Sequence, residues 1–337
     1  MVSISHEFFI QRCISLSQTG MGAVAPNPMV GAVLVHEGKI IGEGFHRVYG
    51  QAHAEVNCID SVPDTLQSLI PVSTMYVSLE PCAHHGKTPP CADLIIQHKI
   101  PKVVVGCVDT FSAVAGRGIQ KMKDAGIEVM TGVLEEACRA VNRRFFTFHE
   151  KKRPYIILKW AQSADGFIAP PDGQPVRISN SYTDRLVHQW RTREMAILVG
   201  TNTALKDNPK LTARLWPGKQ PLRIVVDRTL QIPAHYQLHN AEAPTIFVSE
   251  DKFDFSQDII PQLLTRLHAD NIQSVIVEGG AHLLQQFIAG GVWDEARVIT
   301  GQHTLGGGLQ APVLQNASLQ EELEVQGDLI SVYTSST

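Results

Sequence analysis

The chain has 337 residues, of which 44% are hydrophobic and 18% charged, so it can form a large core and is long enough for two domains. The net charge of −4 argues against nucleic-acid binding, and six cysteines are too few for a disulfide scaffold. The chain contains no apolar run near the roughly 20 residues of a membrane helix, and its N-terminus lacks the pattern of a signal peptide. These features predict a cytoplasmic enzyme that binds neither nucleic acid nor membrane.

The first half, residues 1–150, predicts one α/β domain. Apolar spacing indicates a helix over 6–18, and two apolar runs on either side of Glu37-Gly38 indicate a β-hairpin over 29–46. Helices and strands alternate after the hairpin, and a long amphipathic helix ends the domain. The helices are expected over 53–59, 93–98, 118–124 and 134–149, and the strands over 75–79, 102–108 and 127–130. This order predicts a three-layer arrangement.

Two cysteines, a histidine and a glutamate in this half have the composition of a catalytic zinc site. His53 and Glu55 form a His-x-Glu pair, and Cys82 follows a proline, with Cys91 nine positions later. A catalytic zinc has three protein ligands and an open position for water, and a His-x-Glu pair with a Pro-Cys element is typical of hydrolytic deaminases. We therefore predict one Zn²⁺ per chain, bound by His53, Cys82 and Cys91, with Glu55 transferring protons. The alternative for each cysteine is a buried core side chain.

The spacing of this motif also limits its setting. His53 and Glu55 are two residues apart, so they can serve one site only at a helix entrance, since in mid-helix they would point to different faces. The His-Glu-x-x-His motif of the common zinc proteases, with its two histidines four residues apart on one helix face, does not occur in the sequence.

A charged segment that ends in proline, residues 150–154, separates the halves and places a second domain over 151–337. Its strands are expected over 155–161, 167–169, 196–200, 222–226, 245–248, 274–277 and within 292–300, and its helices over 181–194, 201–205 and 283–287. This alternation predicts a nucleotide-binding sheet with helices on both faces. The glycine pair Gly279-Gly280 lies between a strand and a helix, where backbone N–H groups bind phosphate, although a tight packing turn is the alternative.

The first half resembles the deaminase half of the bifunctional riboflavin-biosynthesis deaminase–reductase family. The resemblance lies in Asn27-Pro28-Met29-Val30-Gly31, in His53-Ala54-Glu55, and in Pro81-Cys82 with eight residues before Cys91. Cytidine-type deaminases usually have only two residues between their cysteines. The resemblance implies a cytidine-deaminase-like α/β/α fold that deaminates a 2,5-diamino-6-ribosylamino-4(3H)-pyrimidinone 5′-phosphate. It places at the substrate Asn27, His46 and Lys87.

The second half resembles the reductase half of the same family, which is similar in fold to dihydrofolate reductase and uses NADPH. The matching stretches are 158–166, 200–214 and 277–280. The resemblance implies reduction of the ribosyl group of 5-amino-6-(5-phosphoribosylamino)uracil to a ribityl chain, by hydride from the cofactor. It places at the cofactor Ala161, Arg177, Thr203, Asp207, Gly280, Ala281, His282, Leu283, Leu284, Gln285 and Gln286. It places at the substrate Lys159, Arg191, Leu211, Arg214 and Glu278, with the two arginines suited to gripping phosphate.

The chain departs from the family pattern in two loops. Residues 109–112 read Asp-Thr-Phe-Ser where the family has Asp-Pro-Asn-Pro, so this loop has lost two rigid residues. Arg177 stands where the family has a cofactor-facing tryptophan, and Pro175 where it has a substrate-facing serine.

Two other hypotheses compete with the bifunctional one. The second half of a zinc deaminase could bind a phosphorylated ligand only to regulate the first half; retention of Asp207 and the Gly279-Gly280 turn together with the arginines argues for a reductase. An RNA-editing deaminase would need a basic, aromatic-rich groove, which the acidic balance disfavours. We expect phosphorylated pyrimidines as substrates and, from the resemblance, a homodimer or larger homo-oligomer.

Overall fold

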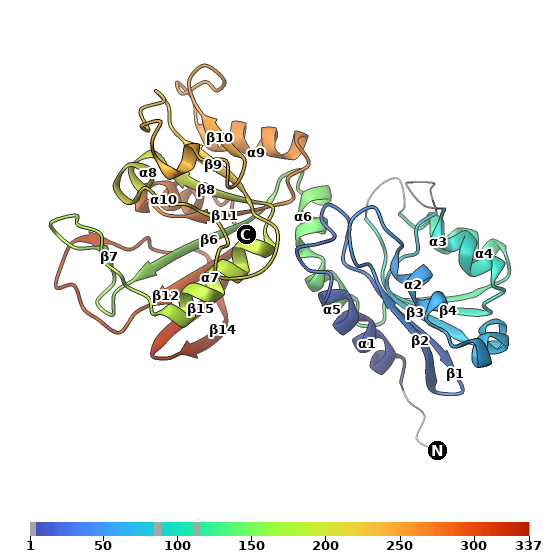
Figure 1. Ribbon diagram of the computed structural model, residues 1–337. Coiled ribbons are helices and arrows are strands. Elements are labelled where there is room, and N and C mark those ends of the chain that lie inside the picture. The colour runs from blue at the N-terminus through green and yellow to red at the C-terminus, as the bar shows by residue number, and fades with distance from the viewer. Residues whose placement is uncertain (1–4, 84–88, 111–114, 337) are drawn as a thin grey trace. The chain divides into compact units, whose positions relative to one another are not determined.

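The computed structural model describes residues 5–83, 89–110 and 115–336, and the chain divides into two compact units (Figure 1). Unit 1 comprises Met1–Lys152 and unit 2 comprises Arg153–Thr337. Each unit has its own sheet and its own hydrophobic core. Within the described residues, no helix is long and apolar enough to cross a membrane.

Unit 1 is built on a five-stranded mixed sheet in the order β2-β1-β3-β4-β5. The strands are β1 (Gly31–His36), β2 (Lys39–Phe45), β3 (Thr74–Leu79), β4 (Lys102–Cys107) and β5 (Glu128–Thr131). The expected hairpin of β1 and β2 is confirmed, with Gly31 opposite Phe45 and His36 opposite Lys39. Strands β3, β4 and β5 run parallel, so the chain leaves β3 and β4 at the same edge of the sheet. That edge is where ligand-binding loops collect in open α/β sheets.

Helices cover both faces of this sheet and give the predicted three layers. Figure 1 shows α1 and α5 on one side and α3 and α4 on the other. One core joins the first face to α1 (His6–Gln18), α5 (Glu135–Val141) and α6 (Arg143–Glu150). The second core joins the other face to α2 (Ala54–Asp60), α3 (Cys91–Gln97) and α4 (Arg117–Asp124). A 3₁₀ helix, η1 (Asp64–Val72), connects α2 to β3.

The prediction of one continuous helix over 134–149 is wrong, because the chain breaks at Asn142 into α5 and α6. The Asn142 side chain is buried and pairs with the backbone of Met29, accepting from its N–H at 2.7 Å and donating to its carbonyl at 2.8 Å. An asparagine amide can supply the donor and the acceptor that a strand would otherwise provide. The interruption therefore provides an anchor for the segment that contains Asn27.

Unit 2 contains an eight-stranded sheet in the order β10-β9-β8-β11-β6-β12-β15-β14, in which β15 runs antiparallel to both of its neighbours and all other pairs are parallel. The strands are β6 (Tyr155–Gln162), β8 (Ala196–Gly200), β9 (Leu222–Val226), β10 (Thr245–Val248), β11 (Ser274–Glu278), β12 (Glu295–Thr300), β14 (Ala317–Val325) and β15 (Asp328–Ser335). The short strands β7 (Phe167–Ala169) and β13 (Leu309–Gln310) pair separately. The hairpin of β14 and β15 was not anticipated from the sequence, since β14 is mostly exposed and lacks an apolar face.

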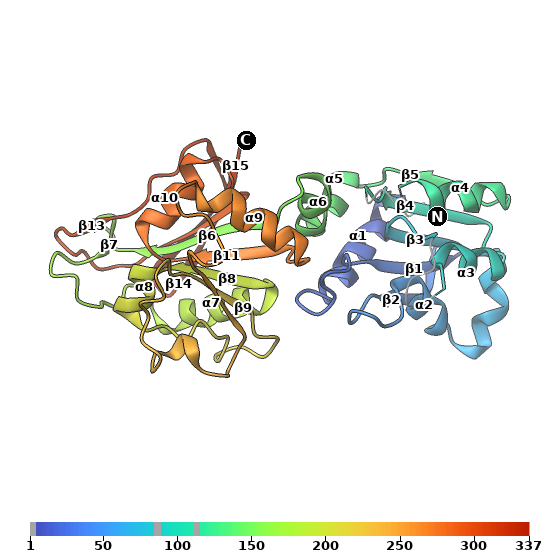
Figure 2. The same cartoon turned by 90° about the horizontal axis from the view of Figure 1, so that it is seen from above.

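Helices cover both faces of this sheet, as predicted. One core contains residues of α9 (Ile259–Ala269) and α10 (Ala281–Ala289), and the other contains residues of α7 (Ser181–Arg193) and α8 (Thr201–Asp207). Figure 2 shows the two pairs on opposite sides of β6 and β11. The N-cap of α7 is Asn180, whose side chain accepts from the N–H groups of Tyr182 and Thr183. A short 3₁₀ helix, η2 (Gln237–His239), lies between β9 and β10.

Gly44 tests how tightly α2 packs on β2, because a Cβ at this position would lie 2.3 Å from the Cys58 nitrogen and 2.5 Å from the Ala54 carbonyl oxygen. We expect Gly44→Ala to destabilise unit 1 by about 1–3 kcal/mol through overpacking against helix backbone. Gly200→Ala is the matched control in unit 2, since its Cβ would meet only Leu283 at 3.9 Å. Denaturant unfolding measures both, and equal small effects would contradict the close packing of α2.

Candidate active sites

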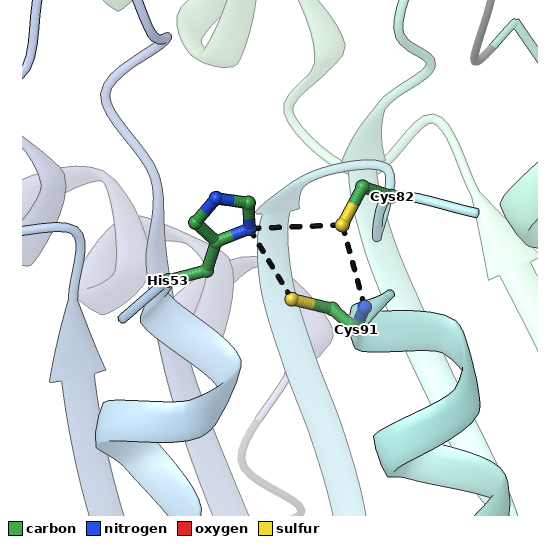
Figure 3. A group of neighbouring side chains, drawn as sticks. All are labelled: His53, Cys82 and Cys91. Carbon is green, nitrogen blue, oxygen red and sulfur yellow. Dashed lines mark hydrogen bonds between the residues drawn. The ribbon is translucent and has the colours of Figure 1, made fainter. Parts of the chain in front are cut away.

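Three side chains in unit 1 converge on one point and could hold a metal ion. The Nδ1 atom of His53 lies 3.6 Å from the Cys82 sulfur and 3.4 Å from the Cys91 sulfur. All three ligand atoms lie within 4.8 Å of one another, and Figure 3 shows the side chains pointing toward a common centre. Among the described residues this is the one group of histidines, cysteines and carboxylates with such spacing.

The local fold explains how residues so far apart in sequence meet. His53 is the extended N-cap residue of α2, so Glu55 lies in the first turn of that helix beside it. Cys82 follows β3 by three residues, and Cys91 is the first residue of α3, immediately after Pro90. The Cys91 N–H donates to the Cys82 sulfur at 3.3 Å, and the Ala92 N–H donates to the Cys82 carbonyl at 3.1 Å. Two helix N-termini and one strand end therefore supply the cluster.

The dimensions of the cluster fit zinc. Tetrahedral zinc has Zn–S bonds of about 2.3 Å and Zn–N bonds of about 2.0–2.1 Å, which places the sulfur and nitrogen ligands about 3.6 Å apart. The two nitrogen–sulfur distances of 3.6 and 3.4 Å are close to this value. One imidazole and two thiols also form a common donor set for catalytic zinc, with room for a fourth ligand.

The electrostatics of the cluster favour a thiolate at Cys82. Hydrogen bonds from the Cys91 thiol and from His53 lower the pKa of Cys82, against the opposing effect of burial. The same interaction with Cys82, together with burial, raises the pKa of Cys91. The hydrogen bond to Cys82 raises the pKa of His53, partly offset by burial. Metal binding would have to displace the remaining proton from Cys91, so the affinity should rise with pH.

Glu55 is buried beside these ligands, with 3% of its surface exposed. Burial, reinforced by the nearby charge of Cys82 and opposed by His53, raises the pKa of Glu55 to about 7. A carboxyl group that titrates near neutral pH can both accept and release a proton.

The other predicted deaminase residues lie next to the cluster where the structure describes them. The Nδ2 atom of Asn27 is 3.2 Å from Nε2 of His46, and Nδ1 of His46 is 3.0 Å from the Ala52 carbonyl oxygen. The carbonyl can only accept, so His46 donates through Nδ1 and receives the Asn27 amide at Nε2. The His46 and His53 rings are 5.1 Å apart, edge to face. Lys87 lies outside the described residues, as does part of the 109–112 segment.

In unit 2 the structure brings together Lys159, Arg191 and Glu278, which come from β6, α7 and β11. The Nε and Nη2 atoms of Arg191 donate to the two Glu278 oxygens at 2.9 and 2.7 Å, and Nζ of Lys159 lies 3.8 Å away from the carboxylate. Burial would raise the pKa of Glu278, but Arg191 and Lys159 outweigh it and lower this pKa to about 2. Burial lowers the pKa of Lys159, partly offset by Glu278.

The Nη1 atom of Arg191 also donates to the Thr212 carbonyl at 3.1 Å. All three nitrogens of the Arg191 guanidinium group therefore donate to groups within the protein. Arg214, by contrast, is exposed. Leu211 is buried, and its φ of 55° is in the left-handed region of backbone conformation.

The predicted cofactor residues of unit 2 differ in their surroundings. Thr203 lies against the glycine turn, within 2.8 Å of where a Gly279 Cβ would be, and Gly279 and Gly280 have φ angles of 103° and 62° that favour glycine. The Leu283 and Leu284 side chains are in the core. The Leu284 N–H donates to the Gly280 carbonyl, so the backbone N–H groups of residues 281–283 come before the first hydrogen bond of this helix. Arg177 is exposed and pairs with Asp184 at 2.5 Å.

The remaining predicted cofactor residues are at the ends or edges of these elements. Ala161 is near the end of β6 and half-buried, and Asp207 is the last residue of α8. His282, Gln285 and Gln286 follow Ala281 in the first turns of α10.

Three buried polar residues near the sites were missed from the sequence. Burial and the charges of Arg191 and Arg214 lower the pKa of His188 to about 4, and its Nδ1 accepts from the Leu215 N–H at 3.4 Å. Its spacing of three from Arg191 on α7 was an available signal. Asn142 gave no signal, because its partner is 113 residues away. Glu80 could have been noticed as a carboxylate that directly follows an apolar strand.

Comparisons with known proteins assign each half of the chain to a known domain family. Residues 154–336 match the RibD C-terminal domain family, and residues 3–107 match the cytidine and deoxycytidylate deaminase zinc-binding region. The chain is 37% identical over 334 residues to the riboflavin biosynthesis protein RibD of Aquifex aeolicus, covering 94% of this chain and 93% of that protein. It is also 37% identical to RibD of Bacillus amyloliquefaciens, covering 95% and 90% of the two chains.

Solved structures show the same two-domain architecture. A diaminohydroxyphosphoribosylaminopyrimidine deaminase/5-amino-6-(5-phosphoribosylamino)uracil reductase of Thermotoga maritima matches with a TM-score of 0.90 and 35% identity, covering 98% of each chain. One structure of RibD from Acinetobacter baumannii matches with a TM-score of 0.88 and 30% identity, covering 98% of this chain and 99% of that one.

The fold and the histidine–cysteine cluster define a deaminase with a zinc-binding domain, joined in one chain to a reductase. The chain belongs to the RibD family, whose members are bifunctional deaminase–reductases of riboflavin biosynthesis. The predictions of family, fold class and bifunctional activity are thereby confirmed.

Replacing Glu278 by glutamine tests the buried ion pair of unit 2. A pKa lowered from 4.5 to about 2 corresponds to about 3 kcal/mol of stability at neutral pH. Because the folded pKa is depressed, this contribution is present above pH 4.5 and is lost as the pH falls toward 2. Glu278→Gln should therefore destabilise unit 2 by about 3–5 kcal/mol at pH 7, and less at pH 3.

Urea unfolding at a series of pH values measures the effect of Glu278→Gln. The control is Glu250→Gln, which removes a carboxylate from an exposed pair with Arg228 and should change stability by less than about 1 kcal/mol. Equal effects of the two variants at pH 7 would show that the buried pair does not support the fold.

Proposed function

We propose that unit 1 removes the amino group from 2,5-diamino-6-ribosylamino-4(3H)-pyrimidinone 5′-phosphate by hydrolysis, with one zinc ion held by His53, Cys82 and Cys91. The observation that carries this proposal is the approach of the three ligand atoms to within 4.8 Å of one another beside a buried Glu55. Zinc, when bound, lowers the pKa of its water toward 7 and so supplies a nucleophile at neutral pH. The name of the Thermotoga relative supports this substrate class.

Glu55 would carry the protons of the reaction. Attack of water on the amino-bearing carbon releases one proton, and ammonia can leave only after its nitrogen has been protonated. A carboxyl group whose pKa is about 7 is well matched to both tasks, and a nearby metal charge would favour its ionised form before the attack. Its place in the first turn of α2 keeps it next to His53 without occupying a ligand position.

Asn27 and His46 are proposed to hold the base or ribose of the substrate, and Lys87 its 5′-phosphate. The hydrogen bond from Asn27 to His46 and the carbonyl of Ala52 fix the orientation of the imidazole. Burial lowers the pKa of His46, so the ring is held neutral. A neutral, oriented ring suits recognition of an uncharged polar group better than that of a phosphate.

Unit 2 is proposed to reduce the ribosyl group of the deaminated product with NADPH. The cofactor supplies the hydride, and the protein supplies binding and orientation. The Gly279-Gly280 turn and the backbone N–H groups of 281–283 are suited to a pyrophosphate, with Thr203 beside them. Ala161, Asp207, Arg177 and residues 284–286 belong to the proposed cofactor site through family resemblance.

The substrate side of unit 2 is proposed to use Lys159, Leu211, Arg214 and Glu278. Because Arg191 donates to Glu278 through two of its nitrogens, we assign the phosphate contact to the exposed Arg214 and an orienting role to Arg191. Lys159 would orient the ribosyl amine or supply a proton, since its buried ammonium has a lowered pKa. Deamination would precede reduction, with the two activities assigned to 1–150 and 151–337. A cytoplasmic location and a homo-oligomeric state remain predictions.

Glu55→Gln separates the two activities. Glutamine has nearly the same shape but cannot carry a proton, so ammonia release should fall by about 100-fold or more. Zinc content should stay at one ion per chain, and NADPH oxidation with the already deaminated substrate should be unchanged. Ammonia detection, metal analysis and absorbance at 340 nm report the three quantities. Glu43→Gln, which removes a partly exposed carboxylate paired with Arg12, serves as the control. Full ammonia release by Glu55→Gln would refute the assigned role.

Arg214→Met tests the proposed phosphate contact of unit 2. Loss of a charge-assisted hydrogen bond should raise KM for the phosphorylated substrate by about 10–100-fold, with a smaller change in kcat. The dephosphorylated substrate should show little difference between wild type and variant. Arg228→Met removes another exposed arginine of unit 2 and should leave both constants unchanged. A wild-type KM in Arg214→Met would assign the phosphate to another residue.

A further inference from the structure

Glu80 is a buried carboxylate that lies one residue after β3 and two residues before Cys82. Its side chain accepts hydrogen bonds from four backbone N–H groups of the described chain. Oε2 receives Asp109 N–H at 3.3 Å and Gly116 N–H at 3.0 Å. Oε1 receives Gly118 N–H at 2.9 Å and Ile119 N–H at 3.3 Å. A carboxylate that is 4% exposed is thus held by peptide groups of two separate segments.

Such an arrangement is demanding for a purely structural residue. A buried carboxyl group needs hydrogen-bond partners for its oxygens, and the partners here are backbone N–H groups whose positions the fold fixes. Two of them belong to the first turn of α4, where the helix dipole also favours a negative charge. The other two donors are the N–H groups of Asp109 and Gly116, two residues that lie between β4 and α4. Glu80 therefore binds the first turn of α4 and two described residues that precede it, Asp109 and Gly116.

Helix α4 also contacts the backbone of Pro81, the residue before the proposed metal ligand Cys82. A Cβ at Gly118 would lie 1.9 Å from the carbonyl oxygen of Pro81, so α4 and the Pro81-Cys82 peptide are in direct backbone contact. Cys82 is in turn bonded through its carbonyl to Ala92 N–H and through its sulfur to Cys91 N–H. A continuous set of contacts thus runs from α4, through Glu80 and Pro81, to Cys82 and the first turn of α3.

We propose that Glu80 is a positioning residue of the deaminase metal centre. Its carboxylate holds the first turn of α4 against the Pro81-Cys82 turn and so sets the place of the Cys82 sulfur relative to His53 and Cys91. This inference rests on the proposed zinc site. It differs from a simple helix cap, because a cap would stabilise α4 without affecting the geometry of the ligands.

Glu80→Gln tests the inference in the full-length chain. Glutamine puts an NH₂ group where one oxygen stood, so two of the four backbone N–H groups lose their acceptor. Loss of zinc to a coloured chelator should become about 10–100-fold faster, and kcat for ammonia release should fall by a similar factor. The ligand-field absorption of the cobalt-substituted protein should shift, because it reports the geometry of the cysteine and histidine ligands. NADPH oxidation with the deaminated substrate should stay within about two-fold of wild type, well below the 10–100-fold effect expected at the metal.

Asp227→Asn is the matched control. Asp227 is likewise buried after a strand, β9, and accepts from the backbone N–H groups of Gln231 and Ile232, but it belongs to unit 2. This variant should lose stability without any change in the cobalt spectrum or in zinc loss. If Glu80→Gln does not yield folded protein, Gly118→Ala displaces the Pro81 carbonyl from the side of α4 and carries the same expectations.

Two results would overturn the inference. A folded Glu80→Gln variant with an unchanged cobalt spectrum and zinc-loss rate, and only a lower melting temperature, would make Glu80 a helix cap. A Gly118→Ala variant with wild-type zinc retention and ammonia release would show that α4 does not position Cys82. A wild-type chain that binds no zinc at all would instead refute the proposed function, so the two failures are distinguishable.

Discussion

A charge removed from water needs a partner of opposite sign or a set of hydrogen-bond donors, and both candidate sites are arranged around this requirement. In unit 1, backbone N–H groups donate to the Glu80 carboxyl group, and hydrogen bonds join the sulfurs of Cys82 and Cys91 to His53. In unit 2, Glu278 is paired with Arg191 and lies close to Lys159. The surrounding helices and strands provide the rigid frame that keeps these partners at their distances.

The two sites meet the requirement by different means. Unit 1 relies on fixed peptide dipoles at the N-termini of α2, α3 and α4, which hold negative side chains without adding positive ones. Among the described residues, no positive side chain therefore takes the place of a cation at the cluster of His53, Cys82 and Cys91, whose donor atoms could hold a metal ion. Unit 2 instead places the positive side chains of Arg191 and Lys159 around the Glu278 carboxylate, while Arg214 is exposed.

Local patterns in the sequence were sufficient for most of the fold and for the metal ligands. The hairpin of β1 and β2 and the alternation of strands and helices depend on short-range spacing, and the grouping of His53, Cys82 and Cys91 follows from a motif of residue types in a fixed order. The features that could not be predicted from the sequence depend on partners far away along the chain. The break at Asn142 serves Met29, 113 residues away, and the pairing of Arg191 with Glu278 spans 87 residues. The strand β14 has several glutamates and no buried face, so its sequence carries little strand signal.

The pairing of Arg191 with Glu278 also limits how the chain can evolve. Two side chains that share a buried bond cannot be exchanged independently, because a change in either leaves the other without a partner. Lys159 lies beside the same carboxylate, so the coupling extends to a third position on another strand. Sequence drift at these sites should therefore proceed through compensating exchanges, and a viable intermediate would depend on the order in which they occur.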